Sequence, residues 1–186
     1  MSETQSWHLI GQRPGPAGWI TVVTQTYRMP DGAEVDWDVM AARDAVAVLA
    51  LTTNEQVILA RQFRPGPGCV LNELPGGLVN EGESPLQAVN RELAEETGFA
   101  GKVEVVGHTW QGANIRRRKW AAVAVDCRRV TEPDFDHSEE FCETVTVSLH
   151  DFCLQLHSGE LTDGWAGYVG LEHLGILGRF NGPRRA

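Results

Sequence analysis

Three glutamates at helical spacing are the residues of this chain best suited to chemistry. Glu92, Glu95 and Glu96 stand at positions i, i+3 and i+4, so a helix brings their carboxylates to one patch of its surface. Like charges at this spacing destabilise a helix by roughly a few tenths of a kcal/mol per pair, and Arg91 compensates only in part. Mg²⁺ favours carboxylate oxygens and removes the conflict. The alternative is a solvated, charged helix face.

The helix that carries these glutamates is predicted from its ends. Ser84 has the N-cap residue type, Pro85 stands at the first helical position, and Gln87 completes a capping box. Gly98 is a typical C-terminal stop. The predicted helix therefore runs from Ser84 to Thr97. Four residues recur at helical spacing and are expected to face the core: Leu86, Val89, Leu93 and Thr97.

A glycine-containing turn leads into this helix. Paired glycines in Glu73-Leu74-Pro75-Gly76-Gly77 allow close approach of the backbone to another group, so a carbonyl can be aimed at a metal ion. Nine residues of the turn and helix fill every defined position of a known box: Gly77, Glu83, Arg91, Glu92, Leu93, Glu95, Glu96, Gly98 and Phe99. In these residues the chain resembles the Nudix hydrolases.

The resemblance implies an α/β fold, a Nudix-type α/β/α sandwich with a mixed sheet, here preceded by an N-terminal β-hairpin. It implies Glu92 and Glu96 as principal metal ligands, with Glu95 and the Gly76 carbonyl as further ligands. Arg91 is counted among the catalytic residues as an orienting partner. The expected cofactor is Mg²⁺, with Mn²⁺ as a possible substitute, and the chemistry is attack of metal-activated water on phosphorus.

Stretches outside the box resemble the ADP-ribose and nucleoside diphosphate sugar pyrophosphatase branch. They are the segments 26–32, 45–49, 61–65 and 73–77, and the later segment 140–143 also fits. The implied reaction is hydrolysis of a nucleoside diphosphate sugar to a nucleoside monophosphate and a sugar phosphate. The segment 111–116 lacks the proline that ADP-ribose hydrolases usually carry, which keeps other nucleotide sugars open. Alternatives are hydrolysis of dinucleoside polyphosphates or modified nucleotides, and a non-catalytic nucleotide-sugar-binding regulator.

Five residues outside the metal site are candidates for substrate binding or catalysis. Arg64 either pairs with Glu73 or reaches the diphosphate, because a guanidinium suits bidentate oxygen recognition. Arg116 either contacts phosphate or sugar or is part of a structural strand. Trp37 either stacks on a nucleobase or staples a hairpin. Glu140, in an acidic loop, is favoured over Glu139 as the general base, with Glu95 and metal-bound water as alternatives.

The remaining elements follow from residue types. A hairpin is expected from Trp19 to Val39 around the turn Pro30-Asp31-Gly32. Strands are expected at 45–51 and 57–63, paired antiparallel, and at 103–110, 120–127 and 143–149, where Thr144 faces outward. Helices are expected at 151–156 and 164–178, and a loop at 132–140.

Composition favours a single ordinary globular domain with a small appendage. The predicted division is an N-terminal segment at 1–40, which we expect to form a homodimer, a Nudix domain at 41–180 and a frayed tail at 181–186. A net charge of −9 argues against nucleic-acid partners, and no apolar run approaches the length of a membrane span. Four cysteines without metal-site spacing are read as reduced thiols in a cytoplasmic protein.

Overall fold

The structure, a computed structural model, describes residues 8–14, 21–134 and 142–179. The chain divides into two compact units. The first comprises Met1–Asp44 and Thr109–Arg118, and the second comprises Ala45–His108 and Lys119–Ala186. The long strands β7 (Phe99–Gly112) and β8 (Ile115–Arg129) therefore contribute their tip to the first unit and the rest of their length to the second.

The first unit is built on three antiparallel strands, β1 (His8–Pro14), β2 (Val22–Arg28) and β3 (Glu34–Ala41). The turn between β2 and β3 contains Gly32, whose φ of 86° is a conformation that favours glycine. The predicted hairpin is thus confirmed, whereas β1 was not predicted. β3 also pairs in parallel with the start of β8, through Met40↔Ile115 and Ala41↔Arg116.

The second unit contains a mixed sheet. β4 (Ala45–Thr52) pairs in parallel with β8 and antiparallel with β5 (Val57–Arg64), as predicted for the latter pair. β5 pairs antiparallel with β6 (Cys69–Glu73) and β9 (Glu143–Val147), and β7 pairs with β8. β6 was not predicted, and of its residues only Glu73 was assigned, to the turn before the helix.

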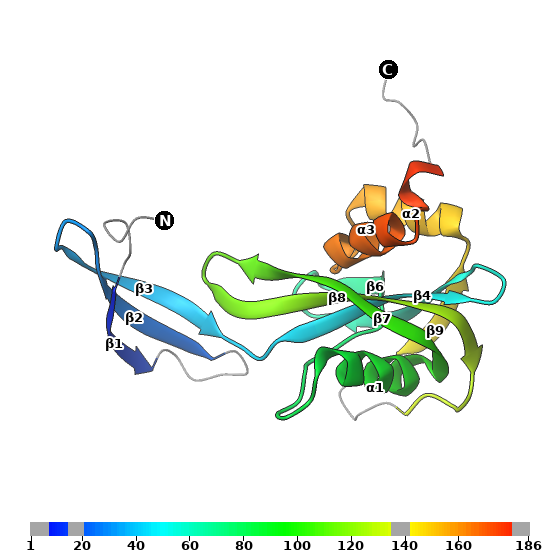
Figure 1. The fold of residues 1–186 in the computed structure, drawn as a ribbon, viewed down its shortest axis with the longest axis horizontal. Coiled ribbons are helices and arrows are strands. Elements are labelled where there is room, and N and C mark those ends of the chain that lie inside the picture. The colour runs from blue at the N-terminus through cyan, green and yellow to red at the C-terminus, as the bar shows by residue number, and fades with distance from the viewer. Residues whose placement is uncertain (1–7, 15–20, 135–141, 180–186) are drawn as a thin grey trace, which may run out of the picture. The chain divides into compact units, whose positions relative to one another are not determined.

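Helices cover both faces of this sheet, with α1 (Pro85–Thr97) on one side and α2 (Leu149–Ser158) and α3 (Gly164–His173) on the other (Figure 1). The 3₁₀ helix η2 (Leu177–Arg179) follows α3. Alternation along β4 separates two cores: Val46 and Val48 pack with the α1 side, whereas Ala47 and Leu49 pack with the α2–α3 side. This arrangement confirms the predicted α/β/α sandwich.

Helix α1 begins and ends as its sequence predicts. Ser84 is the N-cap of a complete capping box with Gln87, and Gly98 closes the helix in the left-handed conformation with φ of 72°. The prediction for Leu86 was wrong, since its side chain is 45% exposed. Leu86 shares the direction of Leu93, one heptad later, but it lies in the first turn, and the buried residues of α1 begin only at Ala88.

Two further expectations concern β9 and the loop that precedes it. Thr144 does not face solvent but is half-buried, and its hydroxyl donates to the carbonyl oxygen of Glu96 at 3.2 Å. The acidic loop is irregular from residue 130 to 134, and its continuation at 135–141 lies outside the described residues. None of the four cysteines forms a disulfide. Within the described ranges, no helix is both long and apolar enough to cross a membrane.

Candidate active site

The three glutamates of α1 differ in exposure. Glu96 is 2% exposed and Glu92 is 9% exposed, whereas the side chain of Glu95 is 45% exposed. A buried carboxylate is unfavourable unless it is paired or hydrogen-bonded, so the burial of Glu92 and Glu96 requires an explanation. Both face the side of α1 that packs on the sheet and on the turn before the helix.

Arg91 supplies the positive charge beside these carboxylates. Its Nη1 donates to Glu92 Oε1 and Glu95 Oε2, each at 2.9 Å. Its Nε and Nη2 bind the two oxygens of Glu83 at 2.9 and 3.0 Å, and Nη2 also donates to the Leu78 carbonyl at 2.9 Å. All five N–H groups of the guanidinium are therefore used. The hydrogen bond with Glu83 is the largest contribution to raising the pKa of Arg91, so this residue stays charged.

The Gly76-Gly77 turn is attached to β4 and to α1. The carbonyls of Pro75 and Gly77 each accept from an amide of β4, those of Val48 and Val46, at 2.9 Å. Between them the amide of Gly76 donates to Glu96 Oε2 at 2.8 Å.

Both glycines are required by close approaches. A Cβ at Gly77 would lie 2.3 Å from Glu92 Oε1 and 2.7 Å from Oε2, and a Cβ at Gly76 would lie 2.2 Å from the Val46 carbonyl oxygen. Only glycine at position 77 lets the carboxylate of Glu92 lie against the turn. The turn is thus a cradle for one carboxylate and a hydrogen-bond donor for a second.

The oxygen donors gathered here suit a hard divalent cation. Carboxylate oxygens with a backbone carbonyl are the ligands that Mg²⁺ accepts, and a cation would offset the burial of Glu92 and Glu96. Their side chains have not converged on one point, because Glu92 is bound by Arg91 and Glu96 by Gly76. Accordingly, no group of three His, Cys, Asp or Glu side chains within the described ranges is already arranged to hold a metal ion.

Arg64 and Glu73 form an ion pair next to this turn. Arg64 Nε donates to Oε2 of Glu73, which is 1% exposed. The other oxygen, Oε1, accepts from the hydroxyl of Thr162, a residue that the sequence did not single out. Of the two expectations for Arg64, the ion pair with Glu73 is therefore present. Eighty-nine residues separate Glu73 from Thr162, so no local sequence signal points to this contact.

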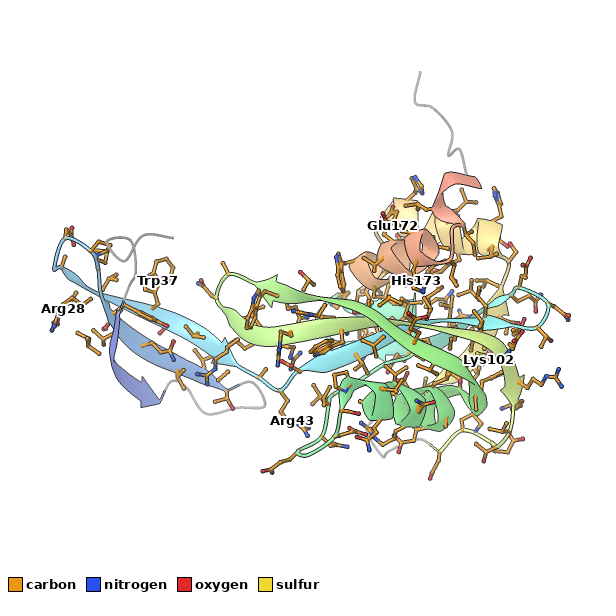
Figure 2. The ribbon with its side chains drawn as sticks, viewed as in Figure 1. Arg28, Trp37, Arg43, Lys102, Glu172 and His173 are labelled. Atoms are coloured by element: carbon orange, nitrogen blue, oxygen red, sulfur yellow. The ribbon has the colours of Figure 1, made fainter. Side chains whose placement is uncertain are left out.

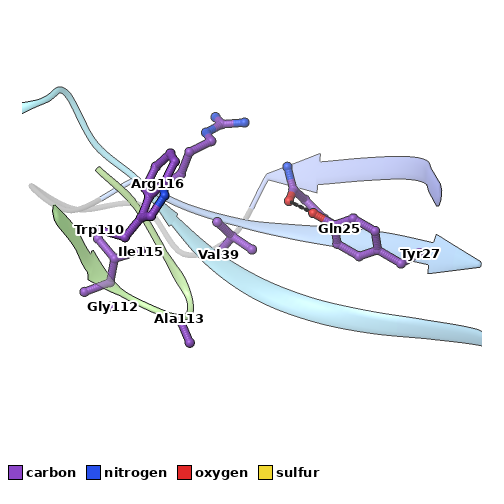
Figure 3. A pocket seen from close by; sticks show the side chains of 8 residues that line it. All are labelled: Gln25, Tyr27, Val39, Trp110, Gly112, Ala113, Ile115 and Arg116. Carbon is purple, nitrogen blue, oxygen red and sulfur yellow. Dashed lines mark hydrogen bonds between the residues drawn. The ribbon is translucent and has the colours of Figure 1, made fainter. Parts of the chain in front are cut away.

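The other two predicted substrate residues belong to the first unit. Trp37 stands on β3, opposite Gln25, and is 40% exposed (Figure 2). Arg116 is exposed on β8 and lines a cavity of about 580 Å³ with Trp110, Tyr27 and buried Gln25 (Figure 3).

The structure brings Glu92, Glu95, Glu96, Gly76 and Arg91 together in the second unit. Glu140 lies outside the described residues.

Comparison with known proteins decides the family to which this site belongs. A family profile described as NUDIX domain matches residues 41–164, two thirds of the chain. The chain belongs to the Nudix family. The predicted family and the predicted enzyme class, a Nudix hydrolase, are confirmed, and the Nudix match includes the Gly76-Gly77 turn, α1 and Thr162.

Several curated Nudix relatives carry names from one branch. The chain is 35% identical over 155 residues to an ADP-ribose pyrophosphatase of Saccharomyces cerevisiae, covering 72% of this chain and 66% of that protein. It is 38% identical over 96 residues to an ADP-sugar pyrophosphatase of Mus musculus, covering 46% of this chain and 44% of that one. An ADP-ribose pyrophosphatase of Bacillus subtilis is 27% identical over 158 residues, covering 81% and 82%.

A solved structure shows the same fold. The crystal structure of an ADP compounds hydrolase superposes with a TM-score of 0.75 at 19% identity, covering 95% of this chain and all of that one. The branch predicted from the segments outside the box agrees with the names of these relatives. The first two relatives, from mouse and yeast, are matched over 44% and 66% of their own lengths.

Proposed function

We propose that the chain hydrolyses the diphosphate linkage of a nucleoside diphosphate sugar, ADP-ribose or a related compound. The products are a nucleoside monophosphate and a sugar phosphate. The observation that carries this proposal is the pair of buried carboxylates, Glu92 and Glu96, held against the Gly76-Gly77 turn. The names of the yeast, mouse and B. subtilis relatives support the choice of substrate class.

Glu92 and Glu96 are the proposed principal ligands of Mg²⁺, with Glu95 and the Gly76 carbonyl as further ligands and Mn²⁺ as a substitute. A cation bound there neutralises charge on the diphosphate oxygens and lowers the pKa of water. Arg91 keeps Glu92 and Glu95 in place, because its single Nη1 group binds an oxygen of each. The saturated hydrogen bonding of Arg91 supports an orienting role rather than direct contact with substrate.

Substrate contacts are proposed for Arg64, Arg116 and Trp37, with Glu73 acting on Arg64. The side chain of Arg64 is 38% exposed and, among the residues that the structure describes, binds through Nε alone, so its two amino groups can donate to diphosphate oxygens. Arg116 presents an exposed cation beside an aromatic cavity wall. Trp37 offers an exposed indole on which a nucleobase can stack.

The proposed general base is Glu140. Support comes from the two described ends of its loop, which both bind the backbone of α1. The amide of Asp134 donates to the Glu95 carbonyl at 2.8 Å, and the hydroxyl of Thr144 donates to the Glu96 carbonyl at 3.2 Å. Asp134 and Thr144, which precede and follow Glu140 in the sequence, therefore lie next to two of the proposed ligands. A general base must come within hydrogen-bond reach of the attacking water.

Assembly as a homodimer through the N-terminal segment, residues 1–40, is also proposed, with a Nudix domain at 41–180 and a tail at 181–186. The first unit supports this by exposing large apolar side chains: Ile10 is 41%, Trp37 is 40% and Trp110 is 63% exposed. Burial of such side chains in a contact surface is favourable. Sedimentation at assay concentrations measures the oligomeric state directly.

The test of the proposed function is a product-resolved assay. The protein is incubated with Mg²⁺ and ADP-ribose, other nucleoside diphosphate sugars, dinucleoside polyphosphates or nucleoside triphosphates. We expect a nucleoside monophosphate and a sugar phosphate from the sugar conjugates, at a rate that vanishes when EDTA is added. Preferential turnover of triphosphates or dinucleoside polyphosphates would reject the substrate class while leaving the metal site intact.

A further inference from the structure

The buried carboxylate of Glu73 is held from two sides. Arg64 occupies Oε2 and the hydroxyl of Thr162 occupies Oε1. A carboxylate that is 1% exposed cannot turn toward water for other partners, so these two donors determine how it is oriented. Loss of the Thr162 hydroxyl would leave Oε1 without this donor and free the carboxylate to rotate.

The backbone that carries Thr162 is fixed on both sides. Leu161 is 9% exposed and belongs to the core. Asp163 pairs with Lys119 of β8 at 2.8 Å, and both side chains are mostly buried, at 13% and 17% exposure. The Thr162 hydroxyl is therefore presented from a rigid position, although Thr162 itself is an exposed residue. Its substitution opens no cavity in the core.

Arg64 is the residue that this arrangement orients. A guanidinium is planar, so a hydrogen bond from Nε to a fixed carboxylate limits the plane and direction of the whole group. Among the described residues, no protein acceptor binds the two amino groups of Arg64. Those amino groups are the part of the side chain available to an anion.

We propose that Thr162 is a positioning residue for recognition of the substrate diphosphate, acting through Glu73 on Arg64. This inference rests on the proposed function, since it assumes that Arg64 donates to diphosphate oxygens. Thr162 touches neither the substrate nor the proposed metal ligands. Its contribution is to hold Glu73 Oε1, so that Oε2 keeps Arg64 Nε, and with it the guanidinium plane, in one orientation. The connection between α2 and α3 thereby takes part in substrate binding.

The experiment compares Thr162→Val, which removes the hydroxyl at nearly constant shape, with Thr162→Ser, which keeps it. Thr53→Val is the matched control, because Thr53 is an exposed threonine in the β4–β5 turn. Since a hydrogen bond to a charged group is lost, we expect Thr162→Val to raise the KM for ADP-ribose about fivefold to tenfold and to change kcat less than about twofold. Thr162→Ser and Thr53→Val should stay within about twofold of the wild type.

Two further measurements decide how Thr162 acts. Binding of ADP-ribose with divalent ions chelated should weaken in Thr162→Val by the same factor as KM rises, because chemistry is then absent. In a double-mutant cycle with Arg64→Lys, which keeps the charge but removes the planar fork, the effect of Thr162→Val should fall below about twofold. Independent, additive effects would overturn the proposal, as would unchanged binding by Thr162→Val. If the wild type neither hydrolyses nor binds ADP-ribose or another nucleotide sugar, the proposed function itself fails, and this inference fails with it.

Discussion

Substitution of Gly77 by alanine should separate the geometry of the active site from the stability of the fold. A Cβ at position 77 would lie 2.3 Å from Glu92 Oε1 and 2.5 Å from Cδ. Because these atoms are the far end of a flexible side chain, the carboxylate can move away at little cost in folding free energy. To reach ordinary van der Waals contact, from 3.4 Å upward, it must move by about 1 Å, and a misplacement of that size costs roughly 100-fold in rate.

The neighbouring glycine provides the contrast. A Cβ at Gly76 would meet backbone atoms of β4, the Val46 carbonyl oxygen at 2.2 Å and the Ala47 Cα at 2.8 Å, which cannot move independently of the sheet. Gly76→Ala should therefore lower the free energy of unfolding by about 1–3 kcal/mol or more. Gly164→Ala is the control, because a Cβ there meets nothing within 4 Å.

The assay measures kcat/KM with ADP-ribose and Mg²⁺, and the urea midpoint of each variant. We expect Gly77→Ala to lose about 100-fold in kcat/KM with a nearly unchanged midpoint, and Gly76→Ala to lose stability. Retention of kcat/KM within about threefold in a folded Gly77→Ala protein would show that the position of the Glu92 carboxylate is not needed, and would refute the reasoning. A parallel loss of midpoint and activity in Gly77→Ala would assign its effect to folding.

Four other outcomes are expected. Glu96→Gln should keep the hydrogen bond from Gly76 and the melting temperature but lower kcat more than about 100-fold; near-normal turnover would remove this residue from the metal site. Glu140→Gln should flatten the limb of the pH–rate profile that reports the general base, and an intact profile would place the base elsewhere. Trp37→Ala should raise the KM about tenfold with a smaller change in kcat, and an unchanged KM would return the indole to a structural role. Gly170→Ala should lower the urea midpoint relative to Gly164→Ala, since its Cβ would lie 2.9 Å from Leu49 Cβ, and equal midpoints would contradict this packing.

Local signals predicted the part of the site that lies on one continuous segment. The capping box of Ser84 and Gln87, and the glycine that ends α1, act within a few residues of each other, so their types and spacing were sufficient. The same holds for β4, whose continuous apolar run is buried on both faces. The predicted family is confirmed by the profile match, and the predicted fold class by the likeness to a solved structure.

Features that depend on distant partners were missed or misjudged. The exposure of Leu86 depends on where the sheet stops covering α1, and the half-burial of Thr144 depends on its bond to Glu96. The strand β6 is defined by its pairing with β5, and the strand β1 is defined by its pairing with β2. Thr162 gives no sequence signal because it meets Glu73 across the fold. The site residues, the homodimer and a cytoplasmic location stay predictions.

The attachment of the Gly76-Gly77 turn to β4 has a thermodynamic consequence for ligand binding. Because Pro75 and Gly77 accept hydrogen bonds from the central strand, the turn loses its conformational entropy when the protein folds. A cation or diphosphate arriving later meets backbone that is already ordered and has to immobilise only side chains. Ordering a free glycine-rich loop at the moment of binding would weaken the affinity, since glycine loses more freedom than any other residue.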